Sequence, residues 1–492
     1  MLSSPANLPS VLEQIVRLRR NHVAAAEQRL PLLQIQKQLH DHPPQRRDFV
    51  AGLRCARQPA VIAELKRASP SRGRMREAFS VPALALAYQT AGARALSVLT
   101  EEPHFDGRLD YLQAARQATT LPILRKDFIF SLYQVWESAW AGADAILLIA
   151  ALLDEGSLRQ LVDIARQAGL ATLCEVHSRE ELERARAAEP DCIGVNNRDL
   201  RSLTVDLRVA AELGPELPAA ALGVAESGLR TPADLARMAT AGFDAFLIGE
   251  GFMQAPDPGA ALAQLLAGCR FPEVKICGLT RLSDAQAACA AGASALGFVF
   301  APSPRRASVE QVRAWAAELP TEVLRVGVFA GAPVAEIQAV ALACGLHAVQ
   351  LHGAYTPAEA RALTGQVTVW RAVAMPEGAP AALAWASVAE RFVLDHAAAD
   401  GVSGGSGTSF AWESAAQFAH DLAACSPARM RPPSLMVAGG LTPATVGEAV
   451  RRSGAGGADV ASGVEQQPGI KDHASILAFC RAARRMLRST AA

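Results

Sequence analysis

The chain has 492 residues, half of them hydrophobic and a fifth charged, which is ordinary for a protein with a large core. Lysine plus arginine equals aspartate plus glutamate at 48 each, so the formal net charge is zero and a broad nucleic-acid-binding surface is not expected. The nine cysteines contain no CxxC pair, and no segment matches a signal peptide or a membrane span, so we expect a cytoplasmic protein without a disulfide framework or a thiolate zinc site.

The first 50 or so residues are expected to be helical and to pack across one end of the domain that follows. After them, short apolar runs alternate with helical patterns, which indicates βαβ units and a parallel sheet. Alanine-rich segments such as 157–169 and 231–242, with glycine near their ends, supply crossover helices. Eight strands are predicted in this half, at residues 61–66, 95–100, 121–126, 145–150, 171–176, 192–197, 221–226 and 244–249.

The same alternation begins again after a boundary near residues 269–272. Eight more strands are predicted, at residues 274–278, 295–300, 323–329, 347–353, 367–373, 391–396, 434–440 and 458–463. The sequence therefore predicts an α/β fold of two consecutive (β/α)8 TIM barrels, residues 1–270 with the helical extension and residues 271–492. An open doubly wound sheet is the competing architecture, but a count of eight strands in each half favours closed barrels.

In such barrels the carboxyl ends of the strands and the loops after them form the active-site face. The first half places a set of polar residues there, namely Glu64, Lys66, Glu101, Lys126, Glu175, Asn196, Glu226 and Ser227. Any one of these could be a rim salt bridge, but two lysines facing several glutamates supply groups for proton transfer in both directions. Glycine-rich turns at 225–228 and 247–251 follow the last two strands, where these barrels usually bind phosphate.

The second half has a different chemical signature. Cys277 ends its first predicted strand and Asp395 its sixth, so the two form a candidate base and acid across one barrel mouth. A buried cysteine is most often inert packing, and only its position at a strand end makes this one a candidate. Glycine-rich turns at 404–407, 437–441 and 461–465 again suggest a phosphate.

The motifs of the first half together resemble those of indole-3-glycerol phosphate synthase. They are AELKRASPS (63–71), LSVLTEEPHFDG (96–107), LPILRKDFI (121–129), EV (175–176), GVNNRDL (194–200) and AESGL (225–229). The resemblance implies closure of an indole ring from 1-(2-carboxyphenylamino)-1-deoxyribulose 5-phosphate, with loss of carbon dioxide and water. Residues 69–77 resemble a mobile loop and are a candidate lid.

By this resemblance Lys126 is the general acid on the ribulose carbonyl, and Glu175 is the acid–base group of the dehydration. Lys66 holds the substrate carboxylate or phosphate and can share the acid role, so the choice between the two lysines stays open. The remaining implied residues are Glu64, Ser69, Asn196, Glu226 and Ser227 for the substrate, and Gly228, Gly249 and Glu250 for its phosphate. Glu250 departs from the small residue usual there, and we expect its side chain to turn away and only its backbone N–H to bind.

The second half resembles phosphoribosylanthranilate isomerase over nearly all of residues 273–492. The resemblance lies in KICGLT (275–280), SPRRAS (303–308), VQLHG (349–353), the VLD…GGSG…F run and SGVEQQPGIKD (462–472). It implies an Amadori rearrangement of N-(5′-phosphoribosyl)anthranilate, with Asp395 as acid and the Cys277 thiolate as base. The other implied residues are Arg305 for the anthranilate carboxylate, Gln350 and His352 on the fourth strand, and Gly439, Gly440, Ser462 and Gly463 for the phosphate.

The product of the second half would be the substrate of the first, so the whole chain resembles a bifunctional enzyme of tryptophan biosynthesis. The resemblance implies no metal, nucleotide or redox cofactor, and phosphorylated anthranilate derivatives as the only ligands, with neither nucleic acid nor membrane as partner. A monomer is one state compatible with the sequence. Three alternatives stay open: a barrel pair acting on other phosphorylated sugars, a fusion with one decayed site, and a nucleic-acid contact through the basic loop 66–76.

Overall fold

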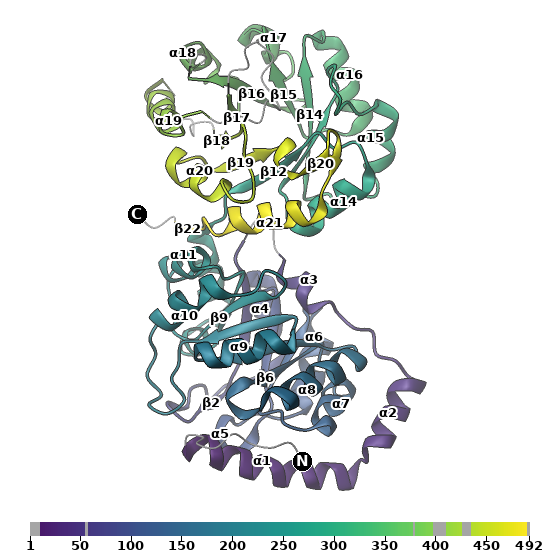
Figure 1. Cartoon of the computed structure of the whole chain (residues 1–492), viewed down its shortest axis with the longest axis vertical. Helices are drawn as coiled ribbons and strands as arrows, with labels where there is room; N and C mark the ends of the chain where they lie inside the picture. The colour runs from purple at the N-terminus through teal and green to yellow at the C-terminus, as the bar shows by residue number, and fades with distance from the viewer. Residues whose placement is uncertain (1–9, 55–57, 377–378, 397–409, 426–433, 490–492) are drawn as a thin grey trace. The chain divides into compact units, whose positions relative to one another are not determined.

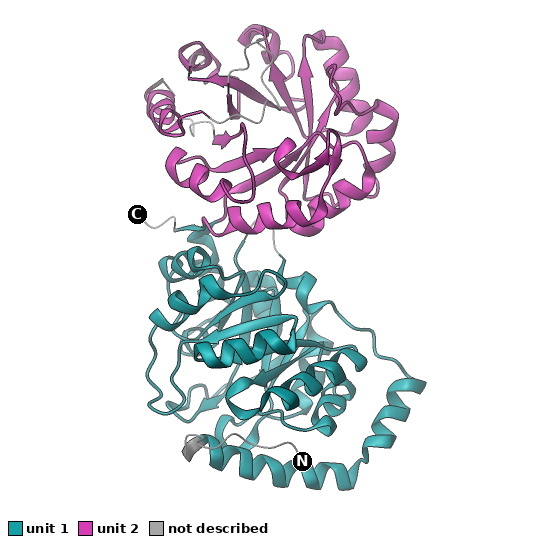
Figure 2. Ribbon diagram, in the orientation of Figure 1, with its two compact units in different colours: residues 1–270, 487–492 teal, residues 271–486 magenta. Residues whose placement is uncertain are grey.

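The computed structural model describes residues 10–54, 58–376, 379–396, 410–425 and 434–489 (Figure 1). The chain divides into two compact units, residues 1–270 with 487–492, and residues 271–486 (Figure 2). Each unit contains one closed barrel of eight parallel strands, so the predicted pair of (β/α)8 barrels is confirmed and the open sheet is excluded. The predicted turn at 404–407 and the first nine residues lie outside the described residues.

The first barrel closes because its first strand pairs with both the last and the second, with Ala60 opposite Ala245 and Ile62 opposite Ala95. All eight strands predicted from the sequence are present, with ends that differ by one or two residues. They are β1 (Ala60–Leu65), β4 (Ala95–Leu99), β5 (Ile123–Lys126), β6 (Ala145–Ile149), β7 (Ala171–Val176), β8 (Cys192–Asn196), β9 (Leu222–Glu226) and β10 (Ala245–Ile248).

Helices surround this barrel, and several begin at a side chain that caps them. Ser131, Asp154 and Ser178 each accept a hydrogen bond from the backbone N–H three residues later, which satisfies a donor that the helix leaves free. The surrounding helices are α4 (Val81–Ala91), α6 (Asp110–Ala118), α7 (Leu132–Trp140), α8 (Glu155–Gln167), α9 (Arg179–Ala188), α10 (Arg208–Leu213), α11 (Pro232–Ala241) and α13 (Pro258–Ala267).

The N-terminal extension is helical, as the sequence predicts, and consists of α1 (Ser10–Arg29), α2 (Leu32–Asp41) and α3 (Phe49–Leu53). Val23 and Ile35 are buried in a cluster with Tyr133 of α7. Arg19 of α1 donates a 2.6 Å hydrogen bond to the buried carboxylate of Asp127, directly after β5. The first long helix is therefore anchored beside the carboxyl end of the barrel strands.

Alternation along β5 separates two cations that are adjacent in the sequence. Arg125 is fully buried and donates to Asp127 at 3.0 Å and to Glu137 of α7 at 2.9 Å, so its charge is neutralised between the strand and the helix layer. Lys126 points the other way, into the barrel mouth. The buried network thus fixes the strand whose last residue is the candidate catalytic lysine.

The second barrel repeats the topology, and the eight strands predicted for it are present. They are β12 (Glu273–Cys277), β13 (Ala295–Val299), β14 (Leu324–Ala330), β15 (Ala348–His352), β16 (Thr368–Met375), β17 (Arg391–His396), β18 (Ser434–Val437) and β19 (Gly457–Val460). The predicted strand 434–440 ends at Val437, because Gly439 and Gly440 adopt positive φ angles of 79° and 62° and turn the chain.

Helices of the second barrel follow its strands as in the first. They are α14 (Leu282–Ala291), α15 (Val309–Trp315), α16 (Val334–Cys344), α17 (Pro357–Arg361), α18 (Ala379–Ala382), α19 (Glu413–Cys425), α20 (Val446–Ser453) and α21 (His473–Arg484). No helix in the described part of the chain is long and apolar enough to cross a membrane.

Short antiparallel pairs complete the two units. In the first unit β2 (Ala68–Ser69) pairs with β3 (Gly73–Arg74) in the loop after β1. Also in that unit, β11 (Cys269–Arg270) pairs with β22 (Arg488–Ser489), which comes from the other end of the chain. In the second unit β20 (Glu465–Gln467) pairs with β21 (Ile470–Lys471).

Candidate active sites

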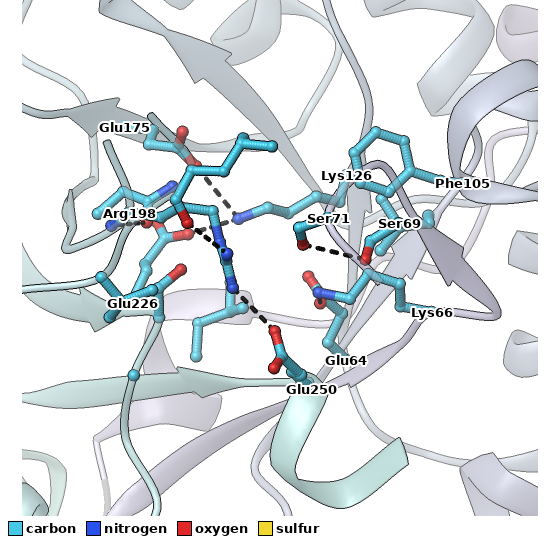
Figure 3. Close-up of a pocket in the computed structure, with 18 of the residues that line it drawn as sticks. Glu64, Lys66, Ser69, Ser71, Phe105, Lys126, Glu175, Arg198, Glu226 and Glu250 are labelled. Atoms are coloured by element: carbon cyan, nitrogen blue, oxygen red, sulfur yellow. Dashed lines mark hydrogen bonds and ion pairs between the residues drawn. The ribbon is translucent and has the colours of Figure 1, made fainter. Parts of the chain in front are cut away.

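A cavity of about 570 Å³ opens at the carboxyl ends of the first barrel's strands, and Leu12 and Ile15 of α1 form part of its wall. Glu101, one of the polar residues that the sequence singles out in the first half, does not line this cavity; it is buried, and its carboxylate accepts hydrogen bonds from the backbone N–H groups of His104 and Phe105. The other residues that the sequence singles out in this half do line it (Figure 3). They are Glu64, Lys66, Ser69, Lys126, Glu175, Asn196, Glu226, Ser227, Gly228, Gly249 and Glu250. The structure therefore gathers groups from β1, β5, β7, β8, β9 and β10 in one enclosed space.

Lys126 lies between two buried carboxylates at the centre of this cavity. Its Nζ donates to Glu175 Oε2 at 3.2 Å and forms a second hydrogen bond to Glu226 Oε2. Figure 3 shows the lysine pointing toward both glutamates, which come from strands β7 and β9. One ammonium thus faces two carboxylates, and none of the three side chains is more than 14% exposed.

This arrangement separates the proton affinities of the three groups. Burial lowers the pKa of Lys126, but the charges of Glu226 and Glu175 more than offset it and hold the pKa above its ordinary value. Burial is the main cause that raises the pKa of Glu226, to about 7. Lys126 lowers this pKa, but repulsion from the charge of Glu175 opposes that effect. Burial also acts on Glu175, but Lys126 and His177 outweigh it and leave its pKa below the ordinary value. One carboxyl group can therefore exchange a proton near neutral pH while the other stays charged.

The second lysine of the cavity is about as exposed as the first but has fewer carboxylates beside it. Lys66 Nζ lies 2.6 Å from Glu64 Oε2, and the lysine side chain is 16% exposed. Ser69 follows on the short strand β2, with its hydroxyl 3.4 Å from that of Ser71. Lys66 therefore has one carboxylate partner where Lys126 has two.

The expectation that the Glu250 side chain turns away from the cavity is wrong. Its carboxylate lines the cavity and is bound by arginines from three different loops: Arg72 at 3.1 Å, Arg198 at 2.8 Å and Arg230 at 3.7 Å. The physical reason is that the three guanidinium groups neutralise the negative charge of Glu250, so the carboxylate is stable inside the cavity. The expectation had considered only repulsion between a carboxylate and a phosphate.

A second cavity, of about 300 Å³, opens at the carboxyl ends of the second barrel's strands. Every residue that the sequence singles out in the second half lines it. They are Cys277, Arg305, Gln350, His352, Asp395, Gly439, Gly440, Ser462 and Gly463. Its lining also includes Asp459, at the end region of β19, which the sequence interpretation did not select.

Cys277 has a charged neighbour that lies on its own strand. Lys275 is fully buried, hydrogen-bonds the thiol, and donates to Asp459 Oδ2 at 2.8 Å. Burial raises the pKa of the Cys277 thiol, and Lys275 acts in the opposite direction by favouring the thiolate. Burial also raises the pKa of Asp395 to about 6, with a further contribution from the Asp459 charge. The cavity thus holds a carboxyl group that is partly protonated near neutral pH and a thiol with an adjacent ammonium.

Arg305 lies at the edge of the second cavity and makes a two-pronged ion pair with Glu465. Its Nε and Nη2 donate to the two carboxylate oxygens, both at 2.9 Å. On β15, Gln350 Nε2 and His352 Nε2 lie 2.8 Å apart, so both side chains face the same side of the strand. Arg305, Gln350 and His352 all line the second cavity.

The turns that end strands β9 and β18 have the backbone conformation of an anion site. Ser227 and Gly228 have consecutive positive φ angles of 64° and 82°, as do Gly439 and Gly440 at 79° and 62°. Successive N–H groups in such turns point into one concavity, which suits a phosphate. A positive φ at a non-glycine residue such as Ser227 is uncommon and often marks a functional turn.

Several charged residues of the two cavities were missed in the sequence. Lys275 precedes Cys277 by two residues, so strand periodicity alone puts both on one face and could have identified the lysine. Arg198 follows Asn196 by two residues, directly after β8, and could have been found in the same way. Arg72 lies in the basic loop 66–76 that the sequence had indicated, but its partner Glu250 could not be inferred from that loop. Arg230 and Asp459 had no local signal, because they meet their partners only through the closure of the barrels.

Comparison with known proteins assigns each half of the chain to a family. The family model for indole-3-glycerol phosphate synthase matches residues 12–265, and the model for N-(5′-phosphoribosyl)anthranilate isomerase matches residues 274–482. Tryptophan biosynthesis protein TrpCF from Salmonella typhi is 37% identical over 470 residues, 94% of this chain and 97% of that protein. Indole-3-glycerol phosphate synthase from Albidiferax ferrireducens is 48% identical over 263 residues, 53% of this chain and 99% of that protein.

A solved structure also matches the second half. The phosphoribosyl anthranilate isomerase from Thermotoga maritima is 36% identical and covers 43% of this chain and 98% of its own, with a TM-score of 0.39.

Two closed barrels, each with an enclosed polar cavity at the carboxyl ends of its strands, define a double (β/α)8-barrel enzyme. The two matched family models, and the relative that aligns with nearly the whole chain, identify which double-barrel enzyme family this is. The chain belongs to the family of bifunctional tryptophan-biosynthesis enzymes, with an indole-3-glycerol phosphate synthase domain followed by a phosphoribosylanthranilate isomerase domain.

Proposed function

We propose that the two barrels catalyse consecutive steps on phosphorylated anthranilate derivatives, with the residues of the two cavities in the roles set out below. The second barrel converts N-(5′-phosphoribosyl)anthranilate to 1-(2-carboxyphenylamino)-1-deoxyribulose 5-phosphate. The first barrel then forms indole-3-glycerol phosphate. The observation that carries this proposal is the pair of enclosed acid–base clusters, Lys126 with Glu175 and Glu226 in one barrel and Cys277 with Asp395 in the other.

In the isomerase, Asp395 donates its proton to the furanose oxygen, the ring opens, and the anthranilate nitrogen forms a Schiff base with C1′. A carboxyl group with a pKa raised to about 6 is a suitable donor, since part of it is protonated near neutral pH. The Cys277 thiolate then removes the proton from C2′ to give an enolamine, which tautomerises to the ketone. Lys275 beside the sulfur stabilises the negative charge of the thiolate.

In the synthase, Lys126 protonates the carbonyl oxygen of the ribulose chain as the aromatic carbon that bears the carboxylate attacks the carbonyl carbon. The carboxylate leaves as carbon dioxide. The hydroxyl formed at ring closure then leaves as water with a proton from Glu226, and the charged Glu175 accepts the proton that the new ring loses. Glu226, with a pKa of about 7, can return a proton to the cluster between these steps. Lys126 is favoured over Lys66 for ring closure because it lies between two carboxylates that can accept and return its proton.

The substrate ends are held by groups at the walls of each cavity. In the first barrel we assign Lys66, Ser69 and Asn196 to the substrate's polar groups, with Glu64 as the partner of Lys66. The turns at Ser227–Gly228 and Gly249 receive the phosphate. In the second barrel Arg305 faces the anthranilate carboxylate, Gln350 and His352 line the ribose, and two sets of glycine-containing turns receive the phosphate, at Gly439–Gly440 and Ser462–Gly463.

For the setting of the enzyme we propose a cytoplasmic, single-chain protein that acts on small molecules and not on nucleic acid. The equal numbers of basic and acidic residues support the last point, since a nucleic-acid-binding surface is normally basic. Seven of the nine cysteines are free thiols in the structure, which supports a reducing compartment. Light scattering of the purified chain tests the monomer, and a mass of twice 51.8 kDa would refute it.

The test of the proposed function supplies the purified chain with N-(5′-phosphoribosyl)anthranilate as sole substrate and follows both the loss of anthranilate-type fluorescence and the formation of indole-3-glycerol phosphate. The wild-type chain is expected to form the indole product. Cys277→Ala and Asp395→Ala should each block the first step while the synthase still accepts purified 1-(2-carboxyphenylamino)-1-deoxyribulose 5-phosphate. Loss of both activities from one of these substitutions, with both barrels folded, would contradict two independent sites.

A further inference from the structure

The carboxylate of Glu250 is the meeting point of three loops in the first barrel. Arg72 Nε, between β2 and β3, lies 3.1 Å from Oε1, and Arg230 Nη2, after β9, lies 3.7 Å from the same oxygen. Arg198 Nη2, after β8, donates to Oε2 at 2.8 Å. All four side chains line the synthase cavity, and Figure 3 shows Arg198 and Glu250 pointing toward one another.

The charge of this cluster is unbalanced. Three guanidinium groups act on a single carboxylate, which is 15% exposed, and Lys66, which is itself paired with Glu64, adds to the positive field. Burial raises the pKa of Glu250, but Arg198, Arg72 and Lys66 outweigh it, so the carboxylate is charged at neutral pH. An excess of guanidinium over carboxylate suits a phosphate dianion better than a single glutamate, because the dianion offers twice the charge and three acceptor oxygens.

The contacts that hold Glu250 are of the kind that exchange easily. The Arg72 side chain is 53% exposed and that of Arg230 is 62% exposed, and ion pairs at such exposure contribute little free energy. Arg198 is held independently of Glu250, since its Nη1 also donates to the backbone oxygen of Leu203 at 3.0 Å. Arg198 would therefore keep its place when the glutamate leaves, while Arg72 and Arg230 would lose the contact that the glutamate gives them.

We propose that Glu250 is an internal anion that occupies the arginine cluster of the empty synthase cavity and is displaced by the phosphate of the substrate. The inference rests on the assignment of this cavity to the synthase reaction. Glu250 then lowers the affinity for phosphate by competing with it for the arginines. Arg72 exchanges the carboxylate of Glu250 for the substrate phosphate when substrate binds.

The first test compares Glu250→Gln with the wild-type chain in the synthase assay. Without the competing charge, we expect the KM for the ribulose phosphate and the inhibition constant of inorganic phosphate to fall about three- to ten-fold, with kcat within about two-fold. The matched control is Glu183→Gln, which removes an exposed glutamate–arginine pair with Arg186 on α9, outside the cavity lining. It should leave both constants unchanged.

Two results would overturn the proposal. A rise in KM and in the phosphate inhibition constant would show that Glu250 positions the arginines for the substrate instead of competing with it. Unchanged constants would show that the carboxylate does not occupy the site that phosphate uses. The isomerase rate of each variant, measured in the same preparation, checks that equal amounts of folded chain are compared.

The second test does not depend on turnover and uses trypsin cleavage in the loop after β1. Glu250→Gln should increase the rate of cleavage after Arg72, and inorganic phosphate should slow that cleavage in both proteins. Cleavage after Arg74, which pairs with Glu77 and Asp106, is the internal control and should not respond to the substitution. Equal cleavage after Arg72 in both proteins would refute the internal anion. The wild-type chain could also lack synthase turnover while cleavage after Arg72 still responds to phosphate and to Glu250→Gln. That result would refute the proposed reaction but not the internal anion.

Discussion

Replacement of Lys126 by methionine tests the acid–base cluster of the first barrel most directly. Methionine keeps the length of the side chain and removes its charge, so Glu175 and Glu226 are left facing each other without a cation. We expect the synthase kcat to fall about 10³-fold, within the range found when a general acid is removed. The isomerase rate should be unchanged, because Lys126 lines only the first cavity.

The magnitude of the electrostatic change follows from the distance between the charges. An ammonium 3.2 Å from the Glu175 oxygen contributes about 5 kcal/mol at an effective dielectric constant of about 20, and the contact to Glu226 is at least as strong. One pKa unit corresponds to about 1.4 kcal/mol, so loss of the lysine should raise the carboxyl pKa values by several units. One of the two glutamates is then protonated at pH 8, where both are charged in the wild-type chain.

Two assays check these expectations. Synthase turnover with the purified ribulose phosphate measures the catalytic loss, and infrared difference spectroscopy at pH 8 should detect a protonated carboxylic acid in Lys126→Met that the wild-type chain lacks. Lys37→Met is the matched control, since Lys37 forms an exposed pair with Asp41 on α2. Synthase turnover within about tenfold of wild type, or an isomerase rate that falls in parallel, would refute the reasoning.

Three further predictions concern the isomerase and the N-terminal extension. A Cβ at position 297 would lie 2.7 Å from Cys277 Sγ and 3.0 Å from Lys275 Cε, so Gly297→Ala should lower isomerase kcat at least tenfold and spare the synthase, as separate turnover assays would reveal. The isomerase needs acidic Asp395, with a pKa of about 6, and thiolate Cys277, whose pKa is raised above its ordinary value. Its kcat/KM should therefore rise with pH below about 6 and stay level from there until the thiol itself is ionised, because over that range loss of the acid offsets gain of the thiolate. A decline starting at neutral pH would contradict these assignments. Arg19→Ala should weaken the attachment of α1 by about 1–3 kcal/mol, since Asp127 keeps Arg125 but loses a charged hydrogen bond; unchanged hydrogen exchange in residues 10–29 would argue against this anchor.

The fold was predictable because its signal is local. Most barrel strands are short apolar runs that are largely buried, as β1 and β4 are along their whole length. Their alternation with helices indicates a parallel barrel without any knowledge of distant contacts. The ends of strands were less certain. The run 434–440 remains apolar and small beyond Val437, and only the positive φ angles of Gly439 and Gly440 end the strand.

The composition of the sites was predictable where a side chain stands at a strand end, as Lys126, Glu175 and Glu226 do. What could not be predicted was the partner of each charge. Glu250 was expected to avoid a phosphate site, and this would hold for an isolated carboxylate. Its actual environment depends on Arg72, 178 positions earlier in the chain, and no spacing rule relates the two.

The pairing of β11 with β22 has a consequence for synthesis and for dissection of the chain. The first unit is complete only after residues 487–492 have been synthesised. In the sequence, the isomerase barrel is therefore inserted between the two segments that form the synthase unit. A nascent chain released at residue 270 would leave the edge of β11 without its partner. Cutting the gene at the 270/271 boundary would do the same, and would leave the isomerase fragment with a short tail that has lost its strand partner. A cleaner separation would express residues 271–486 alone and join residues 487–492 to the synthase fragment through a short linker.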